Sequence, residues 1–115
     1  MKLIRLFTRY ENLNRLREKL FRAGAPGLTL FEAQGIGKPL GQMSSELDGH
    51  PTPIPHFKRQ VGVEVVCESD QVEELIDMLV ETCHTGGQGD GKIFVIDVAE
   101  AVRIRTGQRG VDALY

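Results

Sequence analysis

The chain lacks tryptophan and has only two cysteines, Cys67 and Cys83, among its 115 residues. Two cysteines so far apart in sequence suggest neither a disulfide scaffold nor a Cys-x-x-Cys metal motif, so we expect buried or idle thiols. No uncharged run approaches the roughly 18 apolar residues of a membrane span, and the charged start from Met1 to Arg5 has no signal-peptide core. We therefore expect a cytoplasmic location.

An excess of positive charge is also absent. Fourteen Lys and Arg face sixteen Asp and Glu, which gives a formal net charge of −2. Nucleic-acid-binding domains normally carry a strong basic excess, so we expect no nucleic-acid partner. The length and the 41% hydrophobic content instead suit one globular domain over residues 1–115.

Two similar strand–helix–strand units are indicated by the spacing of apolar residues. A first amphipathic helix begins at Leu13 and is stopped by Gly24, and a second is expected to open with Asp70 as its cap. The predicted strands are 2–8, 28–33, 61–65, 93–96 and, after a short turn, 102–105. The pattern predicts an α+β, ferredoxin-like βαββαβ sandwich with both helices on one face.

The other face of this sheet has no cover in the predicted arrangement. Segments 2–8 and 93–96 carry apolar residues on both alternating sets, for example Leu3 beside Ile4 and Phe94 beside Val95. An exposed apolar face is most simply buried against another copy of the chain. We therefore expect a homo-oligomer, with clefts between subunits as candidate sites.

A long segment from Lys38 to Phe57 shows no periodicity and contains most of the prolines. A loop of this length inside a compact domain favours a function, although a tolerated surface insertion is the alternative. His50 and His56 lie in this loop without ligand spacing to the cysteines, so we expect solvated side chains and no metal site.

The segment from Gly86 to Lys92 matches the first part of the phosphate-loop pattern G-x-x-x-x-G-K. Ile93 then stands where a Ser or Thr hydroxyl would hold Mg²⁺, and Lys92 leads into a predicted strand instead of a helix. These departures argue against a P-loop NTPase. The remaining interpretations are a glycine-rich anion cradle and a flexible connection between elements.

Arg103 and Arg105 lie two residues apart on a predicted strand, which would place them on the same side. Two adjacent guanidinium groups indicate an anion or a structural carboxylate between them, unless both are simply solvated. No nucleophile paired with a base is evident in the local sequence. We therefore expect a binding protein and not an enzyme.

Together these segments resemble the PII family of trimeric signalling proteins. The stretch from Thr85 to Val95, followed by Val102 to Gly107, is similar to the family's C-terminal signature nearly residue for residue. The likeness extends less closely over the N-terminal half and is missing only from Lys38 to Phe57. It implies a ferredoxin-like homotrimer with its sheets packed inward and an adenine nucleotide in each cleft between subunits.

The resemblance also implies a set of nucleotide-binding residues and three functional segments. Gly27, Leu28, Thr29 and Glu64 are expected near the adenosine. The residues expected at or around the phosphates are Gly37, Lys38, Gly87, Gly89, Asp90, Gly91, Lys92, Arg103 and Arg105. The loop at about 38–57 resembles the T-loop, which docks on transporters and enzymes; 85–91 resembles the B-loop, and 102–115 the C-terminal strand and tail.

Several positions depart from the family pattern. Pro39 stands where a Gln normally helps to hold Mg²⁺ and 2-oxoglutarate, Gln60 where a Lys binds a 2-oxoglutarate carboxylate, and Gly87 where the B-loop has a Lys. The loop has no Tyr, which excludes uridylylation there. We expect a divergent PII-like sensor of ADP or AMP, with ATP binding left open. It is similar to branches that accompany carboxysome and bicarbonate-transport systems or metal-efflux pumps.

A small anion such as bicarbonate is the favoured second ligand, with Lys38, Lys58 and Arg59 as its counter-charges. One alternative is a nitrogen-regulatory PII that senses ATP and 2-oxoglutarate. A trimeric protein of the divalent-cation tolerance type should instead show clustered His, Cys or carboxylate groups. An acylphosphatase-like hydrolase should carry an Arg in a glycine loop after its first strand, where this chain has Arg9 to Asn12.

Overall fold

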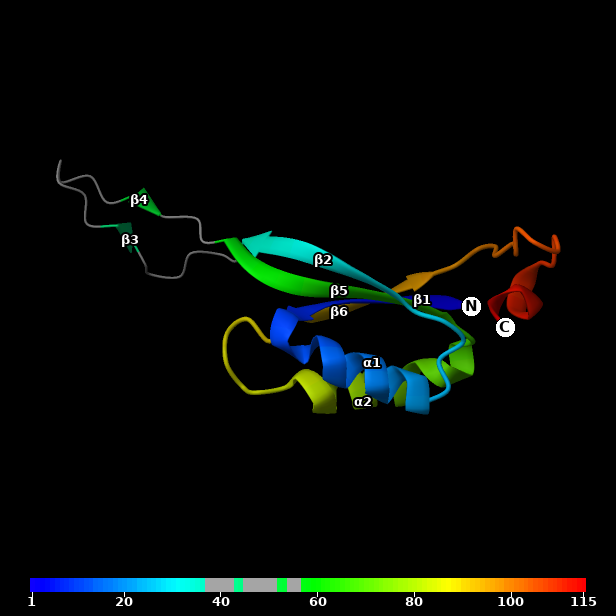
Figure 1. Cartoon of the computed structure of the whole chain (residues 1–115), viewed down its shortest axis with the longest axis horizontal. Coiled ribbons are helices and arrows are strands. Elements are labelled where there is room, and N and C mark those ends of the chain that lie inside the picture. The colour runs from blue at the N-terminus through cyan, green and yellow to red at the C-terminus, as the bar shows by residue number, and fades with distance from the viewer. Residues whose placement is uncertain (37–42, 45–51, 54–56) are drawn as a thin grey trace.

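The computed structural model describes residues 1–36, 43–44, 52–53 and 57–115. Its strands are β1 (Lys2–Arg9), β2 (Thr29–Ile36), β3 (Met43–Ser44), β4 (Thr52–Pro53), β5 (Phe57–Cys67) and β6 (Lys92–Asp97). Its helices are α1 (Leu13–Arg22) and α2 (Val72–Cys83), with short 3₁₀ turns η1 (Tyr10–Asn12), η2 (Ser69–Gln71) and η3 (Gly110–Leu114). Both long helices lie on the same side of the main sheet (Figure 1).

The main sheet has four strands in the order β2-β5-β1-β6, and every neighbouring pair is antiparallel. This order follows from two β-α-β units that interleave, so that each helix connects strands separated by one other strand. The prediction of an α+β, ferredoxin-like fold is confirmed. A separate two-stranded pair joins β3 to β4.

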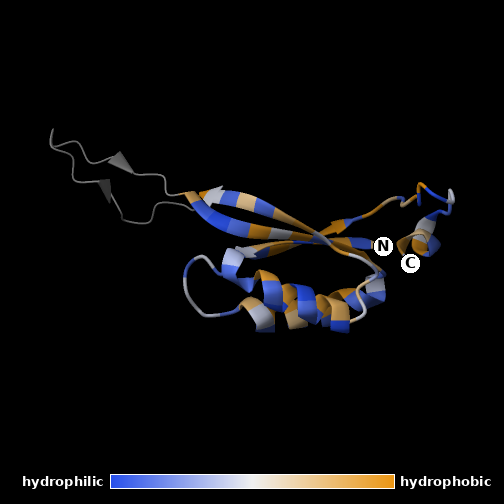
Figure 2. Ribbon diagram, in the orientation of Figure 1, coloured by the Kyte–Doolittle hydropathy of each residue, from blue (hydrophilic) through white to orange (hydrophobic). Residues whose placement is uncertain are grey.

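The core lies between the sheet and the two helices. Alternate residues of β1 and β5 point toward the helices. The apolar ones among them are almost completely buried: Ile4 and Leu6 on β1, and Val61, Val63 and Val65 on β5. They pack with Leu16 and Leu20 of α1 and with Leu75 and Leu79 of α2. Figure 2 shows apolar and polar positions recurring along both helices. Cys67 and Cys83 also belong to it as free, buried cysteines, and burial raises the pKa of both thiols.

The opposite face of the sheet has no covering helix in the part of the chain that is described. Leu3, Arg5 and Phe7 alternate with the buried residues of β1 and are only partly covered. On β6, Phe94 is 46% and Ile96 40% exposed. The expectation of an uncovered apolar face is therefore confirmed for a single chain.

Gly62 of β5 allows the two aromatic rings on this face to meet. Phe7 and Phe31 contact each other edge to face, with ring centroids 6.0 Å apart. A Cβ on Gly62 would lie 2.3 Å from the Phe31 ring, so any larger residue would displace it. The glycine in this strand is thus explained by packing, not by a bend.

Two sequence-based boundaries differ from the structure. Strand β2 runs from Thr29 through Ile36, because its pairing with β5 continues past the predicted end at residue 33. The cap before α2 is Glu68 and not Asp70: the Glu68 carboxylate and the Gln71 side chain form a reciprocal capping box at η2. The extra 3₁₀ turn moves the capping position two residues earlier in the chain.

The predicted strand at 102–105 is wrong. Only Val102 forms a bridge, to Arg109, and a turn lies between them. Gly107 has φ of +74° and its N–H donates to the Arg103 carbonyl at 2.7 Å, which closes the turn. The alternation misled the prediction because none of the described strands pairs with this segment, and Ile104 is fully exposed.

The T-loop prediction at about 38–57 falls mostly outside the described residues, which include only β3, β4 and Phe57 from that range. No helix within the described ranges has the length and apolar character needed to cross a membrane.

Candidate functional site

The glycine-rich loop between α2 and β6 is organised around one carboxylate, that of Asp90. Its Oδ2 accepts hydrogen bonds from the backbone N–H groups of Thr85 at 2.7 Å and Gly86 at 2.9 Å, and its Oδ1 accepts from the Thr85 hydroxyl. These bonds, together with the nearby Arg9 guanidinium, lower the pKa of Asp90 to about 2. The negatively charged Asp90 side chain therefore fixes the backbone conformation of its own loop.

The same loop is fastened to the end of β1. The Thr8 hydroxyl donates to the Asp90 carbonyl at 2.7 Å, and Thr8 in turn accepts from the buried Asn12 amide at 3.0 Å. Arg9 donates from Nη2 to the Gln88 carbonyl at 2.5 Å and lies 3.5 Å from Asp90 Oδ1. Because one guanidinium bridges two loop residues, the loop and the strand end form a single unit.

Gly91 is required where this loop joins β6. Its φ is +109°, and a Cβ at this position would lie 1.9 Å from the carbonyl oxygen of Phe7. No other residue fits such a close approach of two backbones. Backbone packing against Phe7 therefore explains the glycine at this position of the motif, independently of any ligand.

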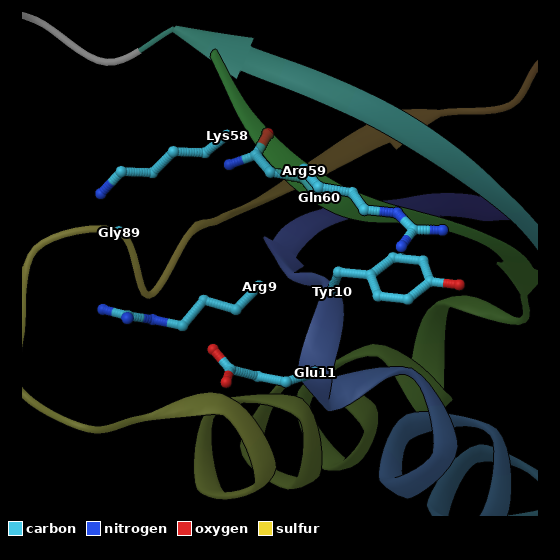
Figure 3. A pocket seen from close by; sticks show the side chains of 7 residues that line it. All are labelled: Arg9, Tyr10, Glu11, Lys58, Arg59, Gln60 and Gly89. Carbon is cyan, nitrogen blue, oxygen red and sulfur yellow. The ribbon is translucent and has the colours of Figure 1, made fainter. Parts of the chain in front are cut away.

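A hollow of about 360 Å³ opens between the loop, the end of β1 and the start of β5 (Figure 3). It is lined by Arg9, Tyr10, Glu11, Lys58, Arg59, Gln60 and Gly89. In Figure 3 the side chains of Arg9 and Lys58 extend on either side of Gly89. Its lining carries three cations and one carboxylate, and two of the cations are paired with carboxylates outside the lining, Arg9 with Asp90 and Arg59 with Glu32. Lys58 and the remaining N–H groups of Arg9 are the donors that a small anion could meet.

The third cation, Arg59, is held differently from the other two. Its guanidinium lies 3.7 Å from the centre of the Tyr10 ring and forms an ion pair with Glu32 of the neighbouring strand. The Glu32 contact raises the pKa of Arg59. Since Glu32 already neutralises it, Arg59 contributes shape more than free charge. Arg9 is likewise paired with Asp90 but keeps further N–H donors, and Lys58 is the lining cation that forms no ion pair among the described residues.

The structure brings together the predicted phosphate residues of the B-loop. Gly87, Gly89, Asp90, Gly91 and Lys92 all lie where β6 begins. Lys92 is exposed and is the register partner of Phe7, so its side chain belongs to the uncovered face. The carboxylate of Asp90 is used within the loop.

The other predicted residues lie elsewhere. Gly27, Leu28 and Thr29 precede or begin β2, and Thr29 is level with Phe94 in the middle of β6. Arg103 and Arg105 belong to the segment after β6, at the end of the sheet away from the B-loop (Figure 1). Strand β6 alone separates the B-loop from the arginines by six residues, or about 20 Å at 3.3 Å per residue. One chain therefore cannot bring both groups to the same phosphate.

Glu64 lies on the uncovered face, between the level of Lys92 at the B-loop end of the sheet and the end from which the Arg103 segment leaves. It is the register partner of Thr29 on one side and of Arg5 on the other, and its carboxylate lies 3.3 Å from the Arg5 guanidinium. The geometry of the predicted arginine pair changes too: Arg103 is partly buried, Arg105 is exposed, and both lie in a turn instead of on one side of a strand. Gly37 and Lys38 fall outside the described residues.

Arg9 was missed as a candidate. Its position after the first strand carries no local motif, and its partners Gln88 and Asp90 follow about eighty residues later, at separations of 79 and 81. Tyr10 was missed for the same reason, because its partner Arg59 comes from a distant strand. Among residues 1–36 and 57–115, no three His, Cys, Asp or Glu side chains gather as a metal site would require.

The antiparallel sheet with its two helices defines a ferredoxin-like α+β protein whose candidate site is a glycine loop bordered by cations. Comparison with known families narrows this class. The family model described as "Nitrogen regulatory protein P-II" matches residues 1–108. The chain belongs to the P-II family.

Individual relatives support the same assignment. Nitrogen regulatory protein P-II of Azospirillum brasilense is 40% identical over 114 residues, which cover 99% of this chain and 100% of the relative. The proteins of the same name from Bradyrhizobium diazoefficiens and Microchaete diplosiphon are 40% and 34% identical over the same coverage. The similarity therefore spans the whole domain.

Proposed function

We propose that this chain is a regulatory protein that binds an adenine nucleotide in clefts between the subunits of a homotrimer. The observation that carries the proposal is the division of the predicted site: the B-loop with Lys92 lies at one end of the sheet and Arg103 at the other. Both groups reach one phosphate chain only if each cleft takes them from two different copies. The family membership supports this arrangement.

The uncovered sheet face supports self-association. Leu3, Phe94 and Ile96 would be removed from water if the faces of three copies met. The Arg5–Glu64 pair would be enclosed with them, and it is already matched in charge. A face of this composition is suited to a permanent interface.

The B-loop supports the binding of phosphate groups. Asp90 fixes its backbone, glycines leave the backbone accessible, and Lys92 provides a cation where the loop ends. A preorganised loop does not have to be ordered when the ligand arrives, so more of the interaction energy appears as affinity. This is the chemistry expected of a nucleotide phosphate cradle.

ADP or AMP is the proposed nucleotide in preference to Mg-ATP. Gly87 provides no side-chain cation, and Gln60, which lines the basic hollow, has no full charge to meet a carboxylate. Pro39 has neither a backbone N–H donor nor a side-chain amide oxygen. Each substitution removes a contact that Mg-ATP with 2-oxoglutarate would need.

The hollow at Arg9 and Lys58 is the proposed site of a second, smaller anion such as bicarbonate. It adjoins the B-loop and the start of β5, directly after the loop at about 38–57. A ligand here would contact both the B-loop, through Gly89, and the start of β5, through Lys58. We propose that the loop in turn docks on a transporter or an enzyme in the cytoplasm.

A nitrogen-regulatory role with ATP and 2-oxoglutarate is the second candidate, because the relatives at 40% identity carry that name. Calorimetric titration separates the two. We expect ADP and AMP to bind at least as tightly as Mg-ATP, with no gain in ATP affinity from 2-oxoglutarate. Clear positive coupling between Mg-ATP and 2-oxoglutarate would favour the nitrogen-regulatory role instead.

A further inference from the structure

The last residue, Tyr115, is joined to the start of α2. Its hydroxyl donates a hydrogen bond to Glu68 Oε2 at 2.6 Å, and this contact raises the pKa of the phenol. Glu68 is a fixed acceptor, because its carboxylate also forms the capping box with Gln71. The C-terminal end is thereby tied to a well-packed part of the domain.

The segment that Tyr115 ends is also in contact with Arg103. Nη2 of Arg103 donates to the Ala113 carbonyl, in η3, at 3.3 Å. The backbone of Arg103 is fixed separately, since its N–H donates to Gln108 at 2.9 Å and its carbonyl accepts from Gly107. The direction of the guanidinium therefore depends on where η3 lies.

The guanidinium is otherwise weakly restrained. Its Nε is shielded from solvent and has no hydrogen-bond partner among the described residues. The bond to Ala113 leaves further N–H groups of Arg103 free for another acceptor. The direction of the Arg103 guanidinium therefore depends on the position of the Ala113 carbonyl that it bonds to.

We propose that Tyr115 is a positioning residue that sets the direction of the Arg103 guanidinium toward the nucleotide phosphates. The inference rests on the proposed function, in which Arg103 contacts those phosphates. Tyr115 acts at a distance, because its hydroxyl bonds to Glu68 and its effect passes through η3 and Ala113. Loss of the hydroxyl releases the C-terminal end of η3, whose start stays held by the bond from the Gly110 N–H to the Ala101 carbonyl. Arg103 then spends less time in the productive direction.

The test compares Tyr115→Phe with the parent by calorimetry, using ADP and adenosine as separate ligands. We expect ADP to bind about fivefold more weakly, as for loss of one hydrogen bond, while adenosine affinity stays unchanged because adenosine has no phosphate. Glu68→Gln keeps an oxygen acceptor for the hydroxyl and should bind ADP like the parent. Ser69→Ala is the matched control, since Ser69 directly follows Glu68 and its hydroxyl accepts a hydrogen bond from the N-terminal amine at 3.5 Å.

A second variant isolates the route through Arg103. In an Arg103→Ala background, Tyr115→Phe should cause no further loss of ADP affinity, because the group that it positions is gone. A further loss in that background, or a parallel fall in adenosine affinity, would overturn the positioning role. Equal ADP binding by parent and Tyr115→Phe overturns this inference alone, whereas no ADP binding by the parent overturns the proposed function and this inference with it.

Discussion

Asp90 is the residue on which the candidate site depends most. Its carboxylate accepts from three donors within the loop, and these bonds depress its pKa from 3.8 to about 2. A group whose pKa is lower in the folded state stabilises the fold above its unfolded pKa, and this contribution is lost as the pH falls through the folded pKa. The loop should therefore stay ordered at pH 4 and above and lose order only near pH 2.

Asp90→Asn tests this assignment at constant pH. The amide lacks the charge and one of the acceptor sites, so the amides of Thr85 and Gly86 should exchange with solvent about tenfold faster, as expected for loss of charge-assisted bonds. Hydrogen exchange measured by NMR provides the check. Asp77→Asn, an exposed carboxylate on α2, is the control for charge removal. Unchanged exchange at Thr85 and Gly86 would contradict the role of Asp90.

Gly91 allows a second prediction at the residue scale. Gly91→Ala combines a strained φ of +109° with a Cβ placed 1.9 Å from the Phe7 carbonyl oxygen, so it should lower the free energy of unfolding by about 3 kcal/mol or more. Gly24→Ala is the matched control, because its φ is +74° but nothing lies within 4 Å of the new Cβ. It should cost only about 1 kcal/mol. Urea denaturation of both variants measures the difference, and equal losses would show that the Phe7 contact is irrelevant.

At the scale of elements, two variants at the start of α2 test whether Glu68, the observed cap, or Asp70, the cap expected from sequence, stabilises the helix. Glu68→Ala removes the capping-box carboxylate and should lower the free energy of unfolding by about 1 kcal/mol. Asp70→Ala removes only a favourable charge in the first turn, and about 0.5 kcal/mol or less is expected. Thermal unfolding of the two variants decides between them. A larger loss of unfolding free energy for Asp70→Ala than for Glu68→Ala would show that Asp70 is the cap, as predicted from sequence.

The elements that the sequence predicted well are those with a single buried face. Val61, Val63 and Val65 of strand β5 alternate, and the apolar residues of helix α1 recur at helical spacing, against one core, so their apolar spacing reports their structure directly. The segment at 102–105 also alternates, but no strand in the described part of the chain pairs with it, and it forms a turn instead. Alternation predicts a strand only where a partner is present to accept its hydrogen bonds, and the local sequence does not contain that partner.

At the scale of the molecule, the B-loop was predictable as a motif but its surroundings were not. Its glycines and Lys92 are contiguous in sequence, whereas Arg9 and Tyr10 reach the hollow only through strand pairing and loop contacts formed on folding. The separation of Lys92 from Arg103 likewise becomes visible only when β6 is placed between them. That separation is the reason for assigning the nucleotide site to two copies of the chain.

The assignment of each cleft to two copies is tested most directly by mixing two impaired variants. Lys92→Ala and Arg103→Ala should each weaken ADP binding by about 1.5–3 kcal/mol, because each removes a charge-assisted contact. They are purified separately, mixed in equal amounts, unfolded together and refolded. The resulting trimers should have about one quarter of their clefts with Lys92 from one copy and Arg103 from its neighbour.

Calorimetry of the refolded mixture counts those clefts. The shared-site account predicts that a fraction of sites near one quarter regains the parent's ADP affinity, while each variant refolded alone regains none. A mixture that binds no better than its two components, although the parent refolds with full binding, would show that Lys92 and Arg103 do not meet across subunits and would contradict the account.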